Sequence, residues 1–119
     1  EHGGARVFPA RATVRAARLV WQDAIRRLER IGPLGVNAPV EDLAAIRLAA
    51  ADVVRLANQA VNGLAAAAGA SASFLSSPLQ RQLRDLQVMR GHVMFDFDRA
   101  AQAAGKVALG VETIPTDLL

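Results

Sequence analysis

PVEDLAAIRLAAADVVRLANQAVNGLAAAAG, residues 39–69, is the stretch that decides the fold. It holds no helix breaker between Pro39 and Gly63, and apolar residues recur in it at three- and four-residue steps. Proline suits the first position of a helix, and the carboxylates of Glu41 and Asp42 suit the positive end of its dipole. We therefore expect a helix that opens at Pro39 and runs to Gly63 or Gly69.

This helix is predicted to be apolar on two faces. One stripe comprises Leu43, Ile46, Ala50, Val53, Ala57, Ala60, Leu64 and Ala67, and a second comprises Val54, Val61, Ala65 and Ala68. A helix with so much apolar surface packs against more than one neighbour. Its alanines allow those neighbours to come close.

An amphipathic helix is predicted on the N-terminal side, from about Thr13 to Ile31. Its apolar face comprises Val14, Ala17, Trp21, Ala24, Ile25, Leu28 and Ile31. The three- and four-residue spacing of these residues is typical of a helix that buries one side. Gly32 and Pro33 end it, because glycine favours a left-handed cap and proline cannot continue the hydrogen bonding.

A third helix is predicted to begin at Pro78, after a capping box of Ser77 and Gln80. We expect it to continue to Ala104 and to end at Gly105. The tail, residues 106–119, contains a glycine and a proline and is expected to pack irregularly or to be mobile.

These elements predict an all-α fold, an antiparallel up-and-down helical bundle of three long helices. Residues 1–119 form a single helical domain in this interpretation. The apolar surface around the middle helix exceeds what two partners can cover. We therefore expect either a fourth helix from outside the chain or a second copy, as a dimer or tetramer.

Composition excludes several classes of protein. The 119 residues contain no cysteine, which removes disulfides, thiolate nucleophiles and cysteine metal sites. The isoelectric point is near 11.0, but the formal charge is only +3 and aromatic residues make up 4%, so nucleic-acid binding is disfavoured. No apolar run is long enough to cross a membrane. We expect a cytoplasmic protein, and the start at Glu1 suggests a domain of a longer polypeptide.

His92 is the main candidate for chemistry. Asp96 follows it by four residues, an offset at which a carboxylate can orient an imidazole that acts as a general base. On spacing alone, an exposed pair of structural value only is favoured. Met89 and Met94 are expected in the core. With only two histidines, no metal site is expected.

One stretch carries a family resemblance. Pro78-Leu79-Gln80-Arg81-Gln82-Leu83-Arg84-Asp85, with His92 seven residues after the aspartate, resembles the C-terminal helical domain of the acyl-CoA dehydrogenase superfamily. The stretch is most similar to the branch of two-component flavin-dependent monooxygenases, which includes hydroxyphenylacetate hydroxylases and dibenzothiophene monooxygenase. Dehydrogenases of the superfamily commonly carry a catalytic glutamate just after the Arg-Asp pair. Here Met89-Arg90-Gly91-His92-Val93 follows instead.

The resemblance implies a parent flavoenzyme with a helical N-terminal domain and a β-rich middle domain before this one. In the monooxygenase branch, a histidine at the place of His92 positions or deprotonates the substrate beside the flavin. The segment at Gly69, Ala70 and Ser71 corresponds to one that approaches the flavin in the family, with Ala70 in place of the more usual glycine.

The resemblance also implies partners. A separate flavin reductase supplies the reduced flavin, FMN rather than FAD, and the parent assembles as a homo-oligomer. The substrate is a small aromatic or heterocyclic molecule. The isolated chain is expected to be inactive and to hold no cofactor, because the middle domain supplies much of the flavin pocket.

Two alternatives stay open at this point. The chain is a dehydrogenase domain if its catalytic glutamate lies elsewhere in the parent. It is a free-standing helical module if its exposed apolar face binds a partner helix or a second copy.

Overall fold

The computed structural model describes residues 2–68 and 78–119. The α-helices are α1 (His2–Ile31), α2 (Val40–Ala68), α3 (Pro78–Arg90) and α4 (Phe97–Ala108). Shorter 3₁₀ segments are η1 (Gly32–Asn37), η3 (Val93–Phe95) and η4 (Pro115–Asp117). Every regular element in the described ranges is helical, so the all-α fold class is confirmed. In those ranges, no helix combines the length and apolarity that a membrane crossing requires.

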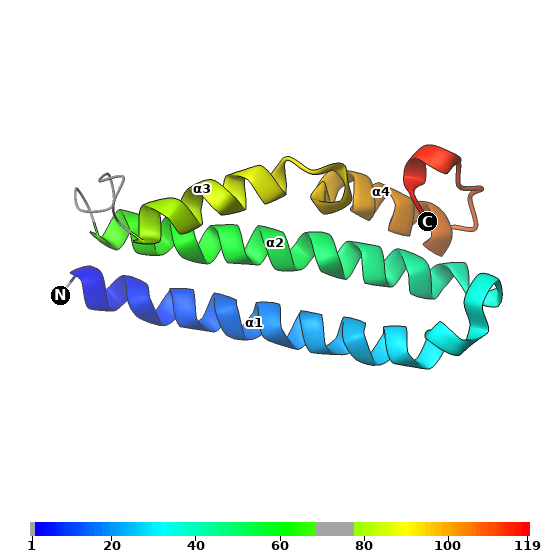
Figure 1. Cartoon of the computed structure of the whole chain (residues 1–119), viewed down its shortest axis with the longest axis horizontal. Helices are drawn as coiled ribbons and strands as arrows, with labels where there is room; N and C mark the ends of the chain where they lie inside the picture. Colours follow the sequence, from blue (N-terminus) through cyan, green and yellow to red (C-terminus); the bar gives the residue numbers. More distant parts are fainter. Residues whose placement is uncertain (1, 69–77) are drawn as a thin grey trace.

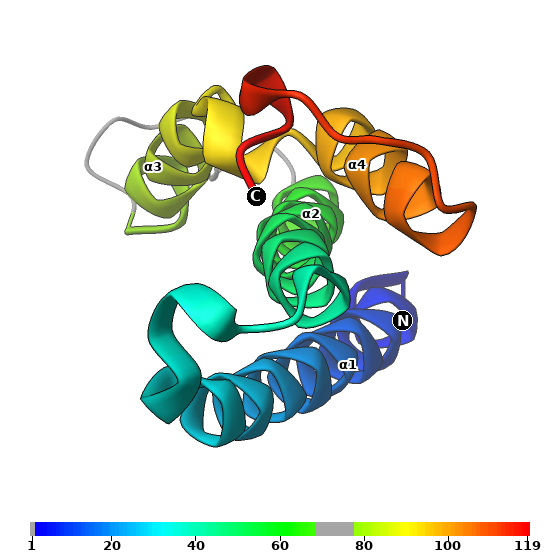
Figure 2. The same cartoon turned by 90° about the vertical axis from the view of Figure 1, so that its right-hand side faces the viewer.

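The middle helix is the centre of the arrangement. α1 runs along one side of α2, and α3 and α4 follow one another along the other side (Figures 1 and 2). The prediction that α2 packs against more than one neighbour is confirmed. The molecule is elongated, 51 × 25 × 24 Å, because two helices of 30 and 29 residues set its length.

Small side chains form most of the core. The buried apolar residues are Ala10, Ala17, Ala24, Ile31, Ala44, Ala51, Val54, Ala60, Ala100 and Ala103. Ala51 and Ala103 are fully buried, each with 0% exposure. Because alanine projects little from the helix surface, these contacts hold the backbones close together.

α1 differs from its prediction in two respects. It begins at His2 rather than Thr13 and contains Pro9. Burial of Ala10 against α2 shows that packing extends past the proline, and packing of this kind overrides local propensity. The predicted apolar face is buried only in part, since Trp21 is 52% and Leu28 is 50% exposed.

The turn between α1 and α2 is held by an ion-pair cluster. Asp42, which is buried, accepts hydrogen bonds from Arg27 at 2.7 Å and from Arg30 at 2.9 Å. The hydrogen bond from Arg27 and the charge of Arg30 lower the pKa of the Asp42 carboxyl below its usual range. Within η1, Gly35 has φ 55, a left-handed conformation that glycine adopts without strain.

The structure divides the predicted third helix into two helices. The prediction that it continues unbroken to Ala104 was therefore wrong. α3 starts at Pro78 as expected but ends at Arg90, and α4 continues to Ala108 rather than ending at Gly105. Asp96 caps α4 by accepting a hydrogen bond from the Arg99 N–H at 3.2 Å. A new cap of this kind starts a second helix instead of extending the first. The capping box at Ser77 lies outside the described residues.

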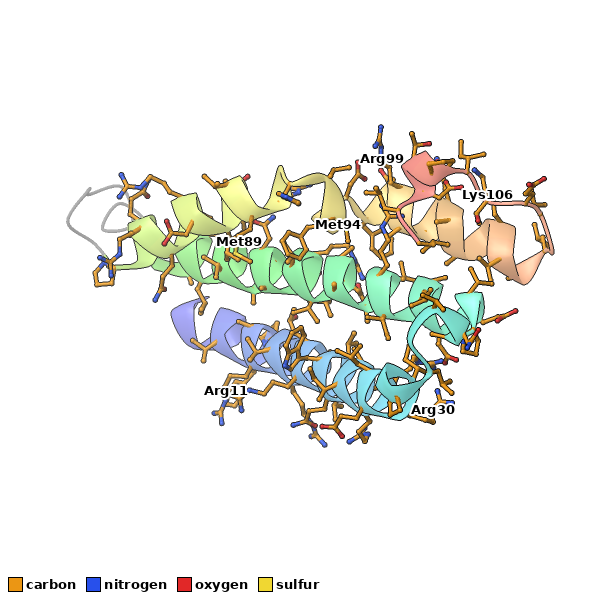
Figure 3. All side chains as sticks on the ribbon, turned by 45° about the vertical axis from the view of Figure 1, so that its right-hand side comes forward. Arg11, Arg30, Met89, Met94, Arg99 and Lys106 are labelled. Atoms are coloured by element: carbon orange, nitrogen blue, oxygen red, sulfur yellow. The ribbon has the colours of Figure 1, made fainter. Side chains whose placement is uncertain are left out.

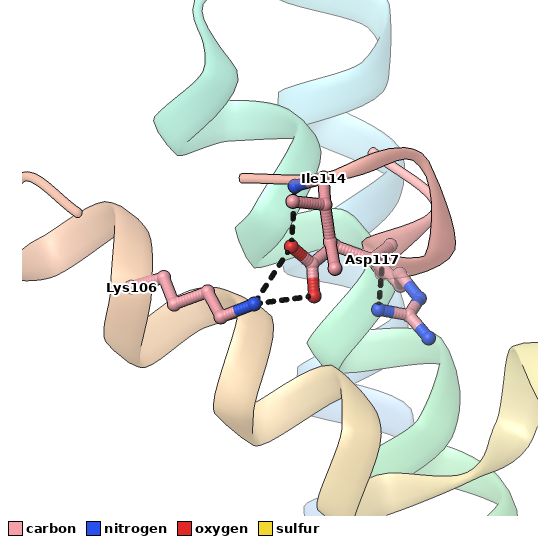
Figure 4. Close-up of polar contacts among 4 residues, drawn as sticks. Lys106, Ile114 and Asp117 are labelled. Atoms are coloured by element: carbon pink, nitrogen blue, oxygen red, sulfur yellow. Dashed lines mark hydrogen bonds and ion pairs between the residues drawn. The ribbon is translucent and has the colours of Figure 1, made fainter. Parts of the chain in front are cut away.

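The C-terminal segment folds back onto α2 and α4 through Asp117. Its carboxylate accepts hydrogen bonds from the Ile114 N–H at 2.8 Å and from Lys106 Nζ at 3.0 and 3.1 Å (Figure 4). The bond from Ile114, followed by that from Lys106, lowers the pKa of the Asp117 carboxyl. Arg47 of α2, which is buried, donates Nη1 to the Asp117 carbonyl. The segment is thus attached to both helices.

Candidate functional site

His92 lies at the break between α3 and α4. Gly91 ends the last turn of α3, and His92 then takes an extended backbone with φ −73 and ψ 136. The side chain is exposed. The sequence predicted this residue inside a continuous helix, but the break places it at the start of η3 instead.

One hydrogen bond determines how the imidazole can act. The Met94 backbone N–H donates to His92 Nδ1 at 3.1 Å. A ring nitrogen that accepts such a bond carries no proton, so the neutral ring holds its proton on Nε2. In this tautomer, Nε2 donates a hydrogen bond and Nδ1 is already occupied.

Asp96 does not orient the imidazole, contrary to the possibility raised by the four-residue spacing. Its carboxylate caps α4 and lies 3.9 Å from Arg99 Nε. The ring instead packs against Phe95, with centroids 5.9 Å apart and planes inclined by 55°. Asp96 therefore serves as a helix cap, and Phe95 is the side chain that contacts the imidazole ring.

The residues around His92 present an apolar surface. Their exposed fractions are 77% for Val88, 43% for Met89, 40% for Val93 and 37% for Met94. Figure 3 shows Met89 on α3 and Met94 in η3, on either side of the break. The expectation that the methionines lie in the core was wrong. Clustered apolar side chains at this level of exposure are typical of a surface that another molecule or domain covers.

A cavity of about 220 Å³ adjoins the break. It is lined by Arg55, Arg90, Phe95, Asp96, Phe97 and Asp98, and His92 is not among the lining residues. Its geometry depends on α2, because the Arg55 guanidinium lies 4.7 Å from the centre of the Phe97 ring and donates to Asp52 at 2.6 and 3.0 Å.

This cavity was not predicted from the sequence. The signal was the alternation of phenylalanine and aspartate over residues 95–98, directly after Gly91 and His92. That pattern combines a helix cap with aromatic anchors.

The other predicted site residues, Gly69, Ala70 and Ser71, lie outside the described residues. Their proposed contact with a flavin stays a prediction. Over the described ranges, no group of three His, Asp or Glu side chains is arranged to hold a metal ion.

Comparison with known proteins assigns the family. The family described as "Acyl-CoA dehydrogenase, C-terminal domain" matches residues 4–97. The chain belongs to this family. The resemblance carried by the Arg84-Asp85 and His92 motif is thereby confirmed for an acyl-CoA dehydrogenase C-terminal domain.

Two curated proteins are similar to this acyl-CoA dehydrogenase C-terminal domain. The p-hydroxyphenylacetate 3-hydroxylase, oxygenase component, of Acinetobacter baumannii is 37% identical over 97 residues, which cover 81% of the chain and 22% of that protein. The pigment production hydroxylase of a Rhodococcus species is 35% identical over 68 residues, which cover 57% of the chain and 18% of that protein. The chain thus spans about a fifth of the length of these relatives. No solved structure matches it.

Proposed function

We propose that the chain is the C-terminal domain of a monooxygenase that uses reduced flavin to hydroxylate a small aromatic or heterocyclic substrate. The observation that carries this proposal is His92, which follows the Arg84-Asp85 pair in a stretch, residues 86–95, that contains no carboxylate. Dehydrogenases of this family commonly carry their catalytic glutamate in that stretch. The similarity to the oxygenase component of a hydroxylase supports the same conclusion.

The cofactor in this proposal is FMN, which supplies the activation of dioxygen when it is bound. The apolar surface of Val88, Met89, Val93 and Met94 fits a planar ring system that must be shielded from water. Gly69, Ala70 and Ser71 are proposed to approach the flavin with their backbones. The remaining walls of the pocket come from the preceding domains of the parent enzyme.

His92 acts in this proposal by donating a hydrogen bond from Nε2 to an oxygen of the substrate. The bond from the Met94 N–H to Nδ1 supports this role, because it favours the tautomer with the proton on Nε2. Such a donor positions the ring of the substrate and stabilises negative charge on its oxygen. Abstraction of a proton by Nε2 would require the other tautomer and the loss of the Met94 bond.

Three substitutions of His92 in the full-length enzyme test this role. His92→Gln keeps an N–H donor near the position of Nε2, whereas His92→Asn keeps an acceptor near Nδ1 and loses the outward donor. His92→Ala removes both. We expect the Asn and Ala variants to lose roughly 100-fold in hydroxylation rate, as for the loss of one oriented donor, and the Gln variant to recover much of it.

The measurements are the hydroxylation rate and the product formed per dioxygen consumed, with reduced FMN supplied directly. A Gln variant as poor as the Ala variant, with a changed pH profile, would instead identify His92 as a base. Unchanged coupling in all three variants would remove His92 from the mechanism and leave the monooxygenase assignment without its main support.

The partners are part of the same proposal. A separate reductase delivers the flavin in the cytoplasm, where reduced nicotinamide cofactors are regenerated, and the parent is a homo-oligomer. Exposed apolar side chains near the C-terminus, Leu109 at 82%, Val111 at 52% and Ile114 at 55%, support self-association.

Titration of the 119-residue chain with reduced and oxidised FMN tests whether it is inactive alone. We expect no saturable binding at micromolar concentrations. Micromolar affinity would contradict the proposal that the preceding domains build much of the pocket.

A further inference from the structure

Both methionines of the chain are hydrogen-bonded to His92 through their backbones. The Met89 carbonyl accepts a bond from the His92 N–H at 3.0 Å, and the Met94 N–H donates to His92 Nδ1 at 3.1 Å. The chain contains two methionines and no cysteine, so these two residues, named here the methionine pair, carry all of its sulfur. The only thioethers of the chain therefore belong to residues that hold His92 from both sides of the break.

The side chains of the methionine pair are open to solvent. Met89 is 43% and Met94 is 37% exposed. They lie one on each side of the break between α3 and α4 (Figure 3). A close-packed core excludes dissolved reagents, whereas a molecule as small as hydrogen peroxide reaches side chains at this exposure.

The chemistry of such a side chain with a peroxide is simple. A lone pair on the methionine sulfur attacks one oxygen of hydrogen peroxide, and the O–O bond breaks as the S–O bond forms. The proton of the transferred oxygen passes to the leaving hydroxide, so the products are a sulfoxide and water. Sulfur loses two electrons and the peroxide gains two. No further oxidant, reductant or metal is needed for this reaction.

Oxidation of the pair changes the surface around His92. A sulfoxide is polar and accepts hydrogen bonds, whereas a thioether is apolar. The neighbouring Val88 is 77% and Val93 is 40% exposed, so two sulfoxides introduce polar groups into an apolar surface. Met94 is also the residue whose N–H binds Nδ1, so a new dipole on its side chain is placed within two residues of the imidazole.

We propose that the methionine pair is an oxidation site, at which hydrogen peroxide converts both thioethers to sulfoxides and alters the environment of His92. The modification is reversible, because methionine sulfoxide reductases restore the thioether from each epimer. This inference concerns the chain itself and does not depend on the proposed monooxygenase function. Only its extension to the parent rests on that function, since reduced flavin that meets dioxygen without a substrate yields hydrogen peroxide.

Intact mass measures the reaction in the 119-residue chain treated with hydrogen peroxide at neutral pH. We expect an increase of about 16 Da for each sulfur, at rates within about tenfold of that of N-acetylmethionine amide, because susceptibility follows exposure. Met89→Leu and Met94→Leu are each expected to remove one oxygen addition, and the double variant both. Leucine is close to methionine in volume, so we expect these variants to keep the fold, and circular dichroism checks this.

Trp21 is the control for selectivity. It is the only tryptophan of the chain and is 52% exposed, so it is at least as accessible as the methionine pair. The electrons of the indole are delocalised over two rings, so indole attacks the peroxide oxygen more slowly than a thioether does. We expect peptide mapping to find both methionine sulfoxides before any oxidised tryptophan.

Nitrogen NMR of His92 measures the effect on the site. The signals of its imidazole are assigned by their loss in His92→Gln. We expect the chemical shift of Nδ1 to change when the wild type is oxidised and to return after treatment with methionine sulfoxide reductases. The double variant with leucine at positions 89 and 94 is the matched control, and peroxide is expected to leave its Nδ1 shift unchanged.

Three outcomes would overturn the proposal. Oxidation more than about tenfold slower than that of N-acetylmethionine amide would show that the two sulfurs are shielded. Oxidation of Trp21 before either methionine would place the sensitive site on α1. Two added oxygens with an unchanged Nδ1 shift would mean that the modification does not reach His92. None of these results bears on hydroxylation by the parent enzyme, which the substitutions of His92 test separately.

Discussion

The two sides of α2 hold their neighbours in different ways. α1 contacts it through a seven-residue repeat of small side chains, of which Ala17 and Ala24 are typical. α3 and α4 are short helices. Besides the buried Ala100 and Ala103 of α4, they are held by individual polar and aromatic contacts, such as the Gln87 bond to Asn58 at 3.2 Å and the Arg55 contact with Phe97. A repeat produces long uninterrupted helices, whereas individual contacts permit the break that exposes His92.

The largest expected effect follows from overpacking the core on the side of α2 that carries Asn58 and Arg47, which contact α3 and the C-terminal segment. Ala51→Leu adds a large side chain at a fully buried position, and we expect a loss of about 3 kcal/mol of unfolding free energy. Urea denaturation followed by circular dichroism measures it. Ala66→Leu on the exposed side of the same helix is the control and is expected to change stability by less than about 0.5 kcal/mol. Equal effects at the two positions would contradict close packing around Ala51.

Acid should weaken the α1–α2 turn. The pKa of the Asp42 carboxyl is lowered by Arg27 and Arg30, so its ion pairs stabilise the folded state above the pKa of an unfolded aspartate, roughly 4, and this contribution is lost as pH falls below that value. We expect Asp42→Asn to be less stable than the wild type at pH 7 and to approach it at pH 3. Thermal unfolding between these pH values measures the difference, and a constant gap would show that Asp42 acts without its charge.

The contrast between the two sides of α2 also explains which features of the fold could be predicted from the sequence. The repeat in α2 and the stops at Gly32 and Pro33 are local or periodic signals, and they correctly predicted the fold class, the end of α1 and the central position of α2. The exposed half of the α1 face, including Trp21, could not be predicted, because exposure depends on which neighbours exist.

The site was predicted less well than the fold. His92 was selected as a residue, and Asp96 was considered as its partner, either orienting the imidazole or forming an exposed pair of structural value only. An aspartate at position 96 suits a helix cap as well as it suits an i, i+4 pair with His92. Nothing in the sequence decides between these two roles. The structure shows the helix cap, and the bond from the Met94 N–H to His92 holds the break next to it.

The cap of α4 offers the next smaller effect. Asp96→Ala removes the acceptor for the Arg99 N–H, and we expect a loss of about 1 kcal/mol in unfolding free energy. Asp98→Ala, also in the first turn but without that bond, is the control and should cost only a few tenths of a kcal/mol. Hydrogen exchange at residues 97–100 localises the change. Protection lost in α3 instead would show that the two helices are one cooperative unit.

The smallest effect tests what causes the break itself. A Cβ at Gly91 would lie 3.4 Å from the Val88 carbonyl oxygen, an ordinary contact, so Gly91→Ala fits without rearrangement. Alanine favours helix by up to about 1 kcal/mol over glycine, and we expect a gain in stability of at most that size with the break retained. The reason is that the Met94 bond to His92 and the Asp96 cap both remain. The chemical shift of His92 Nδ1 reports on that bond. If its signal changes and helical content rises, α3 and α4 have fused, and Gly91 alone keeps the imidazole at the surface.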